Sequence, residues 1–309
     1  MSDRGFSEVV MVTAVPDQLE AFYVALGWSS HHSECTSDTL AYWDLWEVTG
    51  SERVLQAPDA DCRVRLLPVT DTTPLSRPLA TELIVPCGLF DINMRTVDSE
   101  RTSDFIQEHG WRPLTPPIPW QFGDNAVKEF LAVQADGIVL VIVERVSPPL
   151  PGPPMDHMSH VFNSTQLVLD HDESLACLEA LGFAQFAEFN GSLPGEGPRV
   201  LDLLGRPENE GDVRLTISQP AGVLDGAIEL ISTPNITVTP ILENGHGKRG
   251  LAALRIPCDD IEARYNKLCA GEWSHIICKP LASRTVGGQD QLCYAVVTPG
   301  GARLDFFAG

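Results

Sequence analysis

The chain has 309 residues, of which 43% are hydrophobic and 20% charged, and its formal net charge is −21. This composition is typical of a globular protein with buried cores, and the acidity argues against nucleic acids and anionic membrane surfaces as partners. No apolar run approaches the ~20 residues of a membrane span, and the N-terminus lacks the basic and apolar segments of a signal peptide. The eight cysteines include no Cys-x-x-Cys pair, so we expect reduced thiols and a cytoplasmic protein.

The first half of the chain contains two segments of one type. In VVMVTAVPDQLEAFYVALGW (9–28), an apolar run precedes apolar residues at helical spacing, and Gly27 closes the helix. The segment DINMRTVDSERTSDFIQEHGW (91–111) repeats the order of strand, acidic turn, amphipathic helix and Gly-aromatic end. Both segments therefore predict a strand followed by a capped helix.

The second half repeats the pattern twice, in STQLVLDHDESLACLEALGFAQF (164–186) and LAALRIPCDDIEARYNKLCAGEW (251–273). Short strands are predicted after these helices: RVLDLLG, DVRLTISQ and AIELIST in the third unit, and QLCYAVVTP and ARLDFFA in the fourth. Each unit is thus β-α-β-β-β. One such unit leaves a sheet face uncovered, so we expect the units to pair.

A Pro-rich stretch, SPPLPGPPMDH, divides the chain near its middle. Prolines remove hydrogen-bond donors, which favours an exposed linker over residues 147–158. We therefore predict an N-terminal domain, 1–146, with modules of about 1–78 and 79–146. The C-terminal domain, 159–309, would contain modules of about 159–240 and 241–309.

These segments resemble the vicinal oxygen chelate superfamily, which includes glyoxalase I, bleomycin-resistance proteins and extradiol dioxygenases. LVLDHDESLACLEALGF is similar to its strand, acidic turn and helix ending in Leu-Gly-Phe, and QLEAFYVALGW to the end of that helix. DGAIELI and TPGGARLDFF are similar to its closing hairpin. The resemblance implies an α+β fold with four modules paired into two tandem domains with cup-shaped mixed sheets. Members of this superfamily differ in reaction, so the resemblance indicates fold more than chemistry.

The resemblance also implies a divalent metal in the cup, held by His or Gln on each first strand and Glu on each last strand. The matching first-strand positions are Glu8, Asp91, Asn163 and about Leu251, and the last-strand positions are about Arg65, Val141, Glu229 and Asp305. No histidine is among them, whereas iron, nickel and zinc sites favour imidazole. We expect no tightly bound transition metal and no other cofactor, although oxygen ligands alone would allow weak Mg²⁺ or Ca²⁺ binding.

The candidate catalytic residues lie in the second half, and the first half is expected to be structural. Glu229 has apolar neighbours; inside the cup its pKa would rise and suit a general base, whereas on the outer face it would be solvated. Asp305 has the same ambiguity and would share the cavity with Glu229. His160 and His246 precede first strands and are expected at the rim. Asn163 and Gln166 lie in an unusually polar strand and would orient a ligand.

The favoured function is a cytoplasmic enzyme of the lyase or isomerase type that acts on a small, partly apolar organic metabolite. One alternative is a binding protein of the bleomycin-resistance kind, which transforms nothing. Another is a metal-dependent enzyme like the extradiol dioxygenases, with histidine ligands outside the assigned positions. The expected partner is a small molecule, and the sequence leaves open whether the chain forms a homodimer.

Overall fold

In the computed structural model, each of the four predicted modules contains a strand, a helix and further strands in the predicted order, with a second helix inserted in the first module and an additional strand in the second. The structure describes residues 4–45, 47–73, 75, 85–86, 88–122, 124–150, 157–191, 213–232, 238–239 and 248–309. The predicted strand RVLDLLG lies outside these residues, as does most of the Pro-rich stretch between Ser147 and Met158.

The four predicted helices are present together with two short helices that were not predicted, and the first helix begins after Val15 without a side-chain cap. They are α1 (Pro16–Ala25), α2 (Ser37–Trp43), α3 (Ser99–Glu108), α4 (His171–Ala180), α5 (Ile261–Ala270) and the 3₁₀ helix η2 (Glu272–Ile276). Asp98, Asp170 and Asp260 accept backbone hydrogen bonds at the starts of α3, α4 and α5, as expected of N-cap residues. Gly27 and Gly182 end α1 and α4 with φ of +86° and +87°, which favours glycine.

The first and fourth modules form an eight-stranded mixed sheet in the order β17-β18-β19-β16-β1-β4-β3-β2. The first module supplies β1 (Glu8–Thr13), β2 (Ser29–Ser33), β3 (Glu52–Gln56) and β4 (Arg63–Pro68). The fourth supplies β16 (Gly250–Cys258), β17 (Ile277–Val286), β18 (Gln289–Val297) and β19 (Arg303–Ala308).

The second and third modules form a nine-stranded mixed sheet in the order β12-β13-β14-β11-β6-β10-β9-β7, with β8 paired to β9. The second module supplies β6 (Gly88–Thr96), β7 (Arg112–Pro113), β8 (Ile118–Phe122), β9 (Asn125–Val133) and β10 (Val139–Ser147). The third supplies β11 (Met158–Leu167), β12 (Ala184–Gly191), β13 (Val213–Gln219) and β14 (Ala227–Ser232). A short parallel pair joins β5 (Val85–Pro86) to β15 (Val238–Thr239).

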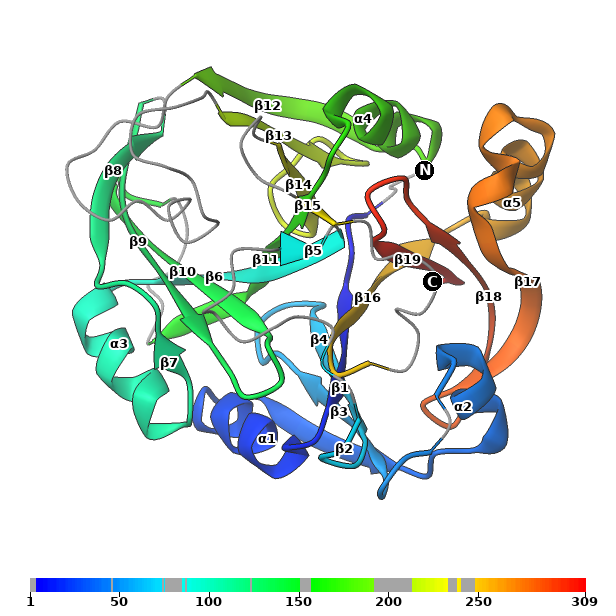
Figure 1. Cartoon of the computed structure of the whole chain (residues 1–309), viewed down its shortest axis with the longest axis horizontal. Helices are drawn as coiled ribbons and strands as arrows, with labels where there is room; N and C mark the ends of the chain where they lie inside the picture. The colour runs from blue at the N-terminus through cyan, green and yellow to red at the C-terminus, as the bar shows by residue number, and fades with distance from the viewer. Residues whose placement is uncertain are drawn as a thin grey trace.

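This pairing corrects the predicted domain division, in which 1–146 and 159–309 would each form one paired domain. The first strands meet as β1 with β16 and β6 with β11, so each sheet draws on both halves of the chain (Figure 1). Consecutive modules meet through their helices instead. Phe22 of α1 lies 6.1 Å from Phe105 of α3 between ring centroids, and Arg264 of α5 donates to the carbonyl of Leu181, which follows α4.

Successive side chains of each strand point alternately to the helix-covered face and to the cup face of its sheet. Side chains such as Val9, Met11, Ile92 and Met94 point toward the helices and belong to one buried core that spans both sheets. The residues between them point into the cups, where two smaller apolar clusters lie. Neighbouring residues of one strand thus serve packing and the site. Within the described part of the chain, no helix is long and apolar enough to cross a membrane.

Candidate active site

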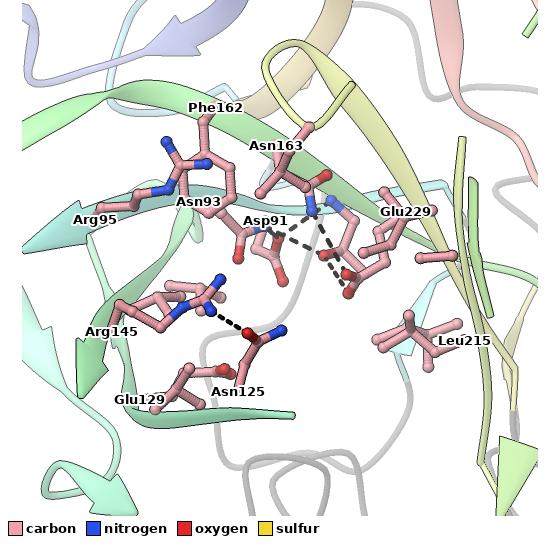
Figure 2. Close-up of a pocket in the computed structure, with 18 of the residues that line it drawn as sticks. Asp91, Asn93, Arg95, Asn125, Glu129, Arg145, Phe162, Asn163, Leu215 and Glu229 are labelled. Carbon is pink, nitrogen blue, oxygen red and sulfur yellow. Dashed lines mark hydrogen bonds between the residues drawn. The ribbon is translucent and has the colours of Figure 1, made fainter. Parts of the chain in front are cut away.

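A cavity of about 350 Å³ opens in the cup of the nine-stranded sheet. Its walls are largely apolar, including Phe90, Phe162, Leu215 and Ile217. A small number of polar and charged side chains converge within it (Figure 2). This combination is typical of small-molecule sites.

Strand alternation places the polar groups. Asp91, Asn93 and Arg95 are spaced by two on β6 and all line the cavity. Parallel to β6 runs β10, where Arg145 lines the cavity at the same end of the sheet as Arg95. Glu229 enters from β14, while its neighbours Ile228 and Leu230 lie in the helix-side core. Of the two orientations that the sequence left open, Glu229 therefore has the one that faces the cup.

Glu229 lies in a small hydrogen-bonded group. Asn163 Nδ2 donates to Glu229 Oε2 at 3.4 Å, and Thr165 Oγ1 donates to Glu229 Oε1 at 3.3 Å. The backbone N–H of Thr165 donates to Asp91 Oδ1 at 3.2 Å, and Asn93 Nδ2 donates to the same oxygen at 2.9 Å. Thr165 pairs with Asp91 on one side and Glu229 on the other, so the three positions form one row across the sheet.

The surroundings of Glu229 disfavour its charged form. Burial raises the pKa of Glu229 to about 8, and the Asp91 carboxylate adds to the rise. The hydrogen bonds from Thr165 and Asn163 oppose this change, since they stabilise the carboxylate. Near neutral pH, Glu229 is therefore mostly protonated but readily loses its proton, which suits a group that gives and takes protons.

The remaining predicted site residues have different positions. Asn163 lines the cavity, and its buried Oδ1 has no hydrogen-bond partner among the described residues, which leaves an acceptor available to a ligand. Gln166 is buried but points away from the cavity and accepts from Thr298 at 3.4 Å. His160 lies outside the lining, 3.7 Å from Asp225. His246 lies outside the described residues.

Asp305 does not share a cavity with Glu229, contrary to the prediction. It lies in the cup of the eight-stranded sheet, because the fourth module pairs with the first rather than the third. There Arg255 Nε donates to Asp305 Oδ2 at 2.7 Å, and the Tyr42 hydroxyl donates to Asp305 Oδ1. The predicted acid/base pair of Glu229 and Asp305 is therefore wrong.

The two cups have the same register but different side chains. In the eight-stranded sheet, Arg255 pairs with Glu8 on one side and Asp305 on the other. In the nine-stranded sheet, Thr165 has the same place between Asp91 and Glu229. The fourth-module position assigned to Leu251 therefore belongs to Arg255, and the third-module position assigned to Asn163 belongs to Thr165.

Ion pairs and a helix fill the cup of the eight-stranded sheet. Arg65 donates to Glu8 at 2.6 Å and to Glu52 at 2.9 Å, while Arg255 lies 3.2 Å from Glu8. Tyr42 and Trp43 of α2 are buried in the apolar cluster on this face, and α2 lies against β17 (Figure 1). This cup is a packed ionic core.

The donor set of the open cup does not fit a transition metal. Its four equivalent positions hold Asp91, Val141, Thr165 and Glu229, so one position is apolar and another neutral. No group of three or more His, Cys, Asp or Glu side chains suited to a metal occurs within the described residues. Iron and zinc sites favour imidazole or thiolate ligands, which this row lacks.

Sequence reasoning missed Arg95 and Arg145 and assigned the first half no chemistry, although Asp91, Arg95 and Arg145 all line the cavity. The available signal was the alternation Asp91-x-Asn93-x-Arg95, three polar residues on one face of an otherwise apolar strand.

The sequence matches no protein-family model and no curated protein sequence. Solved structures are nevertheless similar in fold. Glyoxalase I from Zea mays superposes with a TM-score of 0.65 at 14% identity, covering 99% of this chain and 92% of that one. A Bacillus subtilis protein named as a candidate dioxygenase superposes with a TM-score of 0.59 at 14% identity, covering 99% and 85%. The chain therefore shares the fold of these structures, with its four modules arranged in two sheets.

Proposed function

We propose that the protein is an enzyme that transfers protons on a small, partly apolar organic molecule bound in the cup of the nine-stranded sheet. Glu229 would be the proton-transferring group, and the reaction would be of the lyase or isomerase type. The observation that carries the proposal is the position of Glu229, a carboxyl with a pKa of about 8 that faces an apolar cavity of about 350 Å³.

The surroundings of Glu229 support this role. A carboxylate with a raised pKa is a stronger base than an ordinary glutamate and still returns its proton near neutral pH. In the proposed step, Glu229 takes a proton from the carbon between a carbonyl and a C=C double bond. The C–H electron pair forms a new C=C bond, and the carbonyl π pair moves onto the oxygen to give a dienolate. Return of the proton to the γ-carbon re-forms the carbonyl and completes an isomerisation that moves the double bond into conjugation. The amide of Asn163 lines the same cavity and donates one N–H to Glu229, so its second N–H is available to the substrate oxygen.

The test is solvent deuterium exchange followed by ¹H NMR. A panel of aromatic and aliphatic carbonyl compounds is incubated with the protein in D₂O near pD 8, and compounds that exchange or isomerise are carried forward. For these, Glu229→Gln should lower kcat by about 10²- to 10⁴-fold, the usual scale for a general base. Glu262→Gln changes an exposed glutamate of α5 in the same way and should leave kcat unchanged.

Full activity in Glu229→Gln would refute the role of Glu229. A protein that binds compounds in this cavity but exchanges none of them would instead support the binding-protein alternative, which the apolar lining also suits.

A further inference from the structure

Two arginines line the cavity at some distance from Glu229. Figure 2 shows Arg95 and Arg145 on one side and Glu229, with Asn163 beside it, on the other. Arg95 pairs with Val143 on β10, and Arg145 is two residues further along that strand. The two side chains are therefore diagonal neighbours on one sheet face.

Arg145 has a neutral partner. Its Nη1 donates to Asn125 Oδ1, and no carboxylate of the described residues lies within ion-pair distance of it. In the other cup, the buried Arg65 and Arg255 are each paired with carboxylates. A guanidinium on a cavity wall without a counter-ion favours an anionic ligand, since its five N–H donors fit a carboxylate fork.

Arg95 is only weakly neutralised. Its guanidinium lies 4.0 Å from the centroid of the Phe162 ring, and its Nη1 is 3.4 Å from Asp225, which is 59% exposed. Burial lowers the pKa of Arg95, and the charge of Arg145 acts in the same direction, while Asp225 opposes both. An anion between the two arginines would relieve their mutual repulsion.

Carboxyl groups limit what the anion can be. Asp91 and Glu129 also line the wall. Glu129 pairs with Val143, the strand partner of Arg95, so these carboxyl groups repel a doubly charged group more strongly than a single charge. Asp91 and Arg95 are four residues apart on one strand, which at about 3.3 Å per residue separates their Cα atoms by about 13 Å. An anion bound by the arginines is therefore remote from Glu229.

We propose that the cavity takes an elongated organic monocarboxylate. Its carboxylate binds Arg95 and Arg145, its apolar chain or ring lies along Phe162, Leu215 and Ile217, and its uncharged far end reaches Glu229. The inference rests on the proposed function, because it names the substrate class of the same site.

The test compares two probes of equal shape by isothermal titration calorimetry at pH 7. The probes are 4-phenylbutanoate and its amide, and the proteins are the parent, Arg145→Gln, Arg145→Lys and Arg101→Gln. Arg101 is an exposed residue of α3, so its substitution controls for net charge. The parent should prefer the carboxylate by about 10- to 100-fold, the scale of a hydrogen-bonded charge. Arg145→Gln should lose this preference and keep its affinity for the amide, Arg145→Lys should retain part of it, and Arg101→Gln should match the parent.

The inference is overturned by equal affinity of the parent for both probes, by no measurable binding of either, or by an unchanged preference in Arg145→Gln. Tighter binding of 3-phenylpropyl phosphate than of the carboxylate would overturn the choice of a monoanion. Unfolding curves of the variants verify that each is folded. Glu229→Gln should keep the carboxylate preference, so a failure of the proton-transfer proposal and a failure of the anion site give different results.

Discussion

The two cups of this protein are built from the same four strand positions but have opposite electrostatics. In the eight-stranded sheet, Glu8 faces two guanidinium groups. In the nine-stranded sheet, Glu229 faces apolar walls and another carboxylate. Although burial opposes it, Arg65 and Arg255 hold the pKa of Glu8 near 2, whereas burial raises the pKa of Glu229 to about 8.

The difference shows how one fold provides both a core and a site. Where arginines compensate the carboxylates, the cup is closed and α2 packs over it. Where the equivalent position is Thr165, the neighbouring carboxyl of Glu229 has no strong counter-charge within its row, and burial raises its pKa. Environment rather than residue type thus separates a glutamate that is held charged from one that is held protonated.

The largest expected effect tests the closed cup. Arg255→Ala leaves Glu8 and Asp305 buried without one of their cations, and removal of one partner of a buried ion pair lowers the free energy of unfolding by about 3–5 kcal/mol. Thr165→Val changes the equivalent residue of the open cup and should lower it by less than about 1.5 kcal/mol. Urea unfolding measures the free energy of unfolding of both variants. Equal losses in the two variants would contradict the proposed difference between the closed and the open cup.

The pH dependence of stability should have opposite signs in the two cups. Glu8 has a depressed pKa, so its contribution is present above pH 4.5 and is lost as the pH falls toward 2. The difference of about 2.5 pKa units corresponds to about 3 kcal/mol. Glu229 has a raised pKa, so its contribution is present below pH 4.5 and is lost as the pH rises through about 8.

Urea unfolding of Glu8→Gln and Glu229→Gln between pH 3 and pH 9 separates the two contributions. The stability difference between the parent and Glu229→Gln should shift in favour of the variant with rising pH. The corresponding difference for Glu8→Gln should shift in favour of the parent. If the stability difference between parent and variant changed with pH in the same direction for both variants, the two cups would not differ electrostatically as proposed.

The smallest expected effect is that of metal removal. Because Val141 and Thr165 occupy two of its four positions, the purified protein should contain iron, nickel and zinc well below one ion per chain, and dialysis against EDTA should leave its unfolding curve unchanged. Inductively coupled plasma mass spectrometry measures the content. About one such ion per chain, lost in Glu229→Ala, would instead favour the dioxygenase-like alternative.

The sequence predicts the modules well, because they depend on local periodicity, and it limits Glu229 to two orientations. Ile228 and Leu230 are apolar, so alternation turns Glu229 to the opposite face of the sheet. The pairing of the modules is not local. Four similar units offer equivalent first strands, and Asp305 was assigned to the wrong cup for that reason.

Two further errors have physical causes. The position matched to Leu251 is wrong, since the strand register places Arg255 beside Glu8 and Asp305. Arg255 lies closer along the chain to the start of α5 than Glu8 does to the start of α1, so distance from the helix does not locate the site residue. Arg145 was missed because its role depends on Arg95 from a neighbouring strand, and residues brought together by sheet pairing leave no local pattern.

The most direct test of the account is the titration of Glu229 itself. In ¹³C NMR of protein labelled at the glutamate δ-carboxyl, the resonance that disappears in Glu229→Gln identifies this residue without any substrate. The account predicts that this resonance titrates with a midpoint near pH 8, well above the ordinary glutamate range of about 4.3. A midpoint between pH 4 and pH 5 would show a solvated carboxylate and would contradict the proposal that the open cup holds a proton-transferring group.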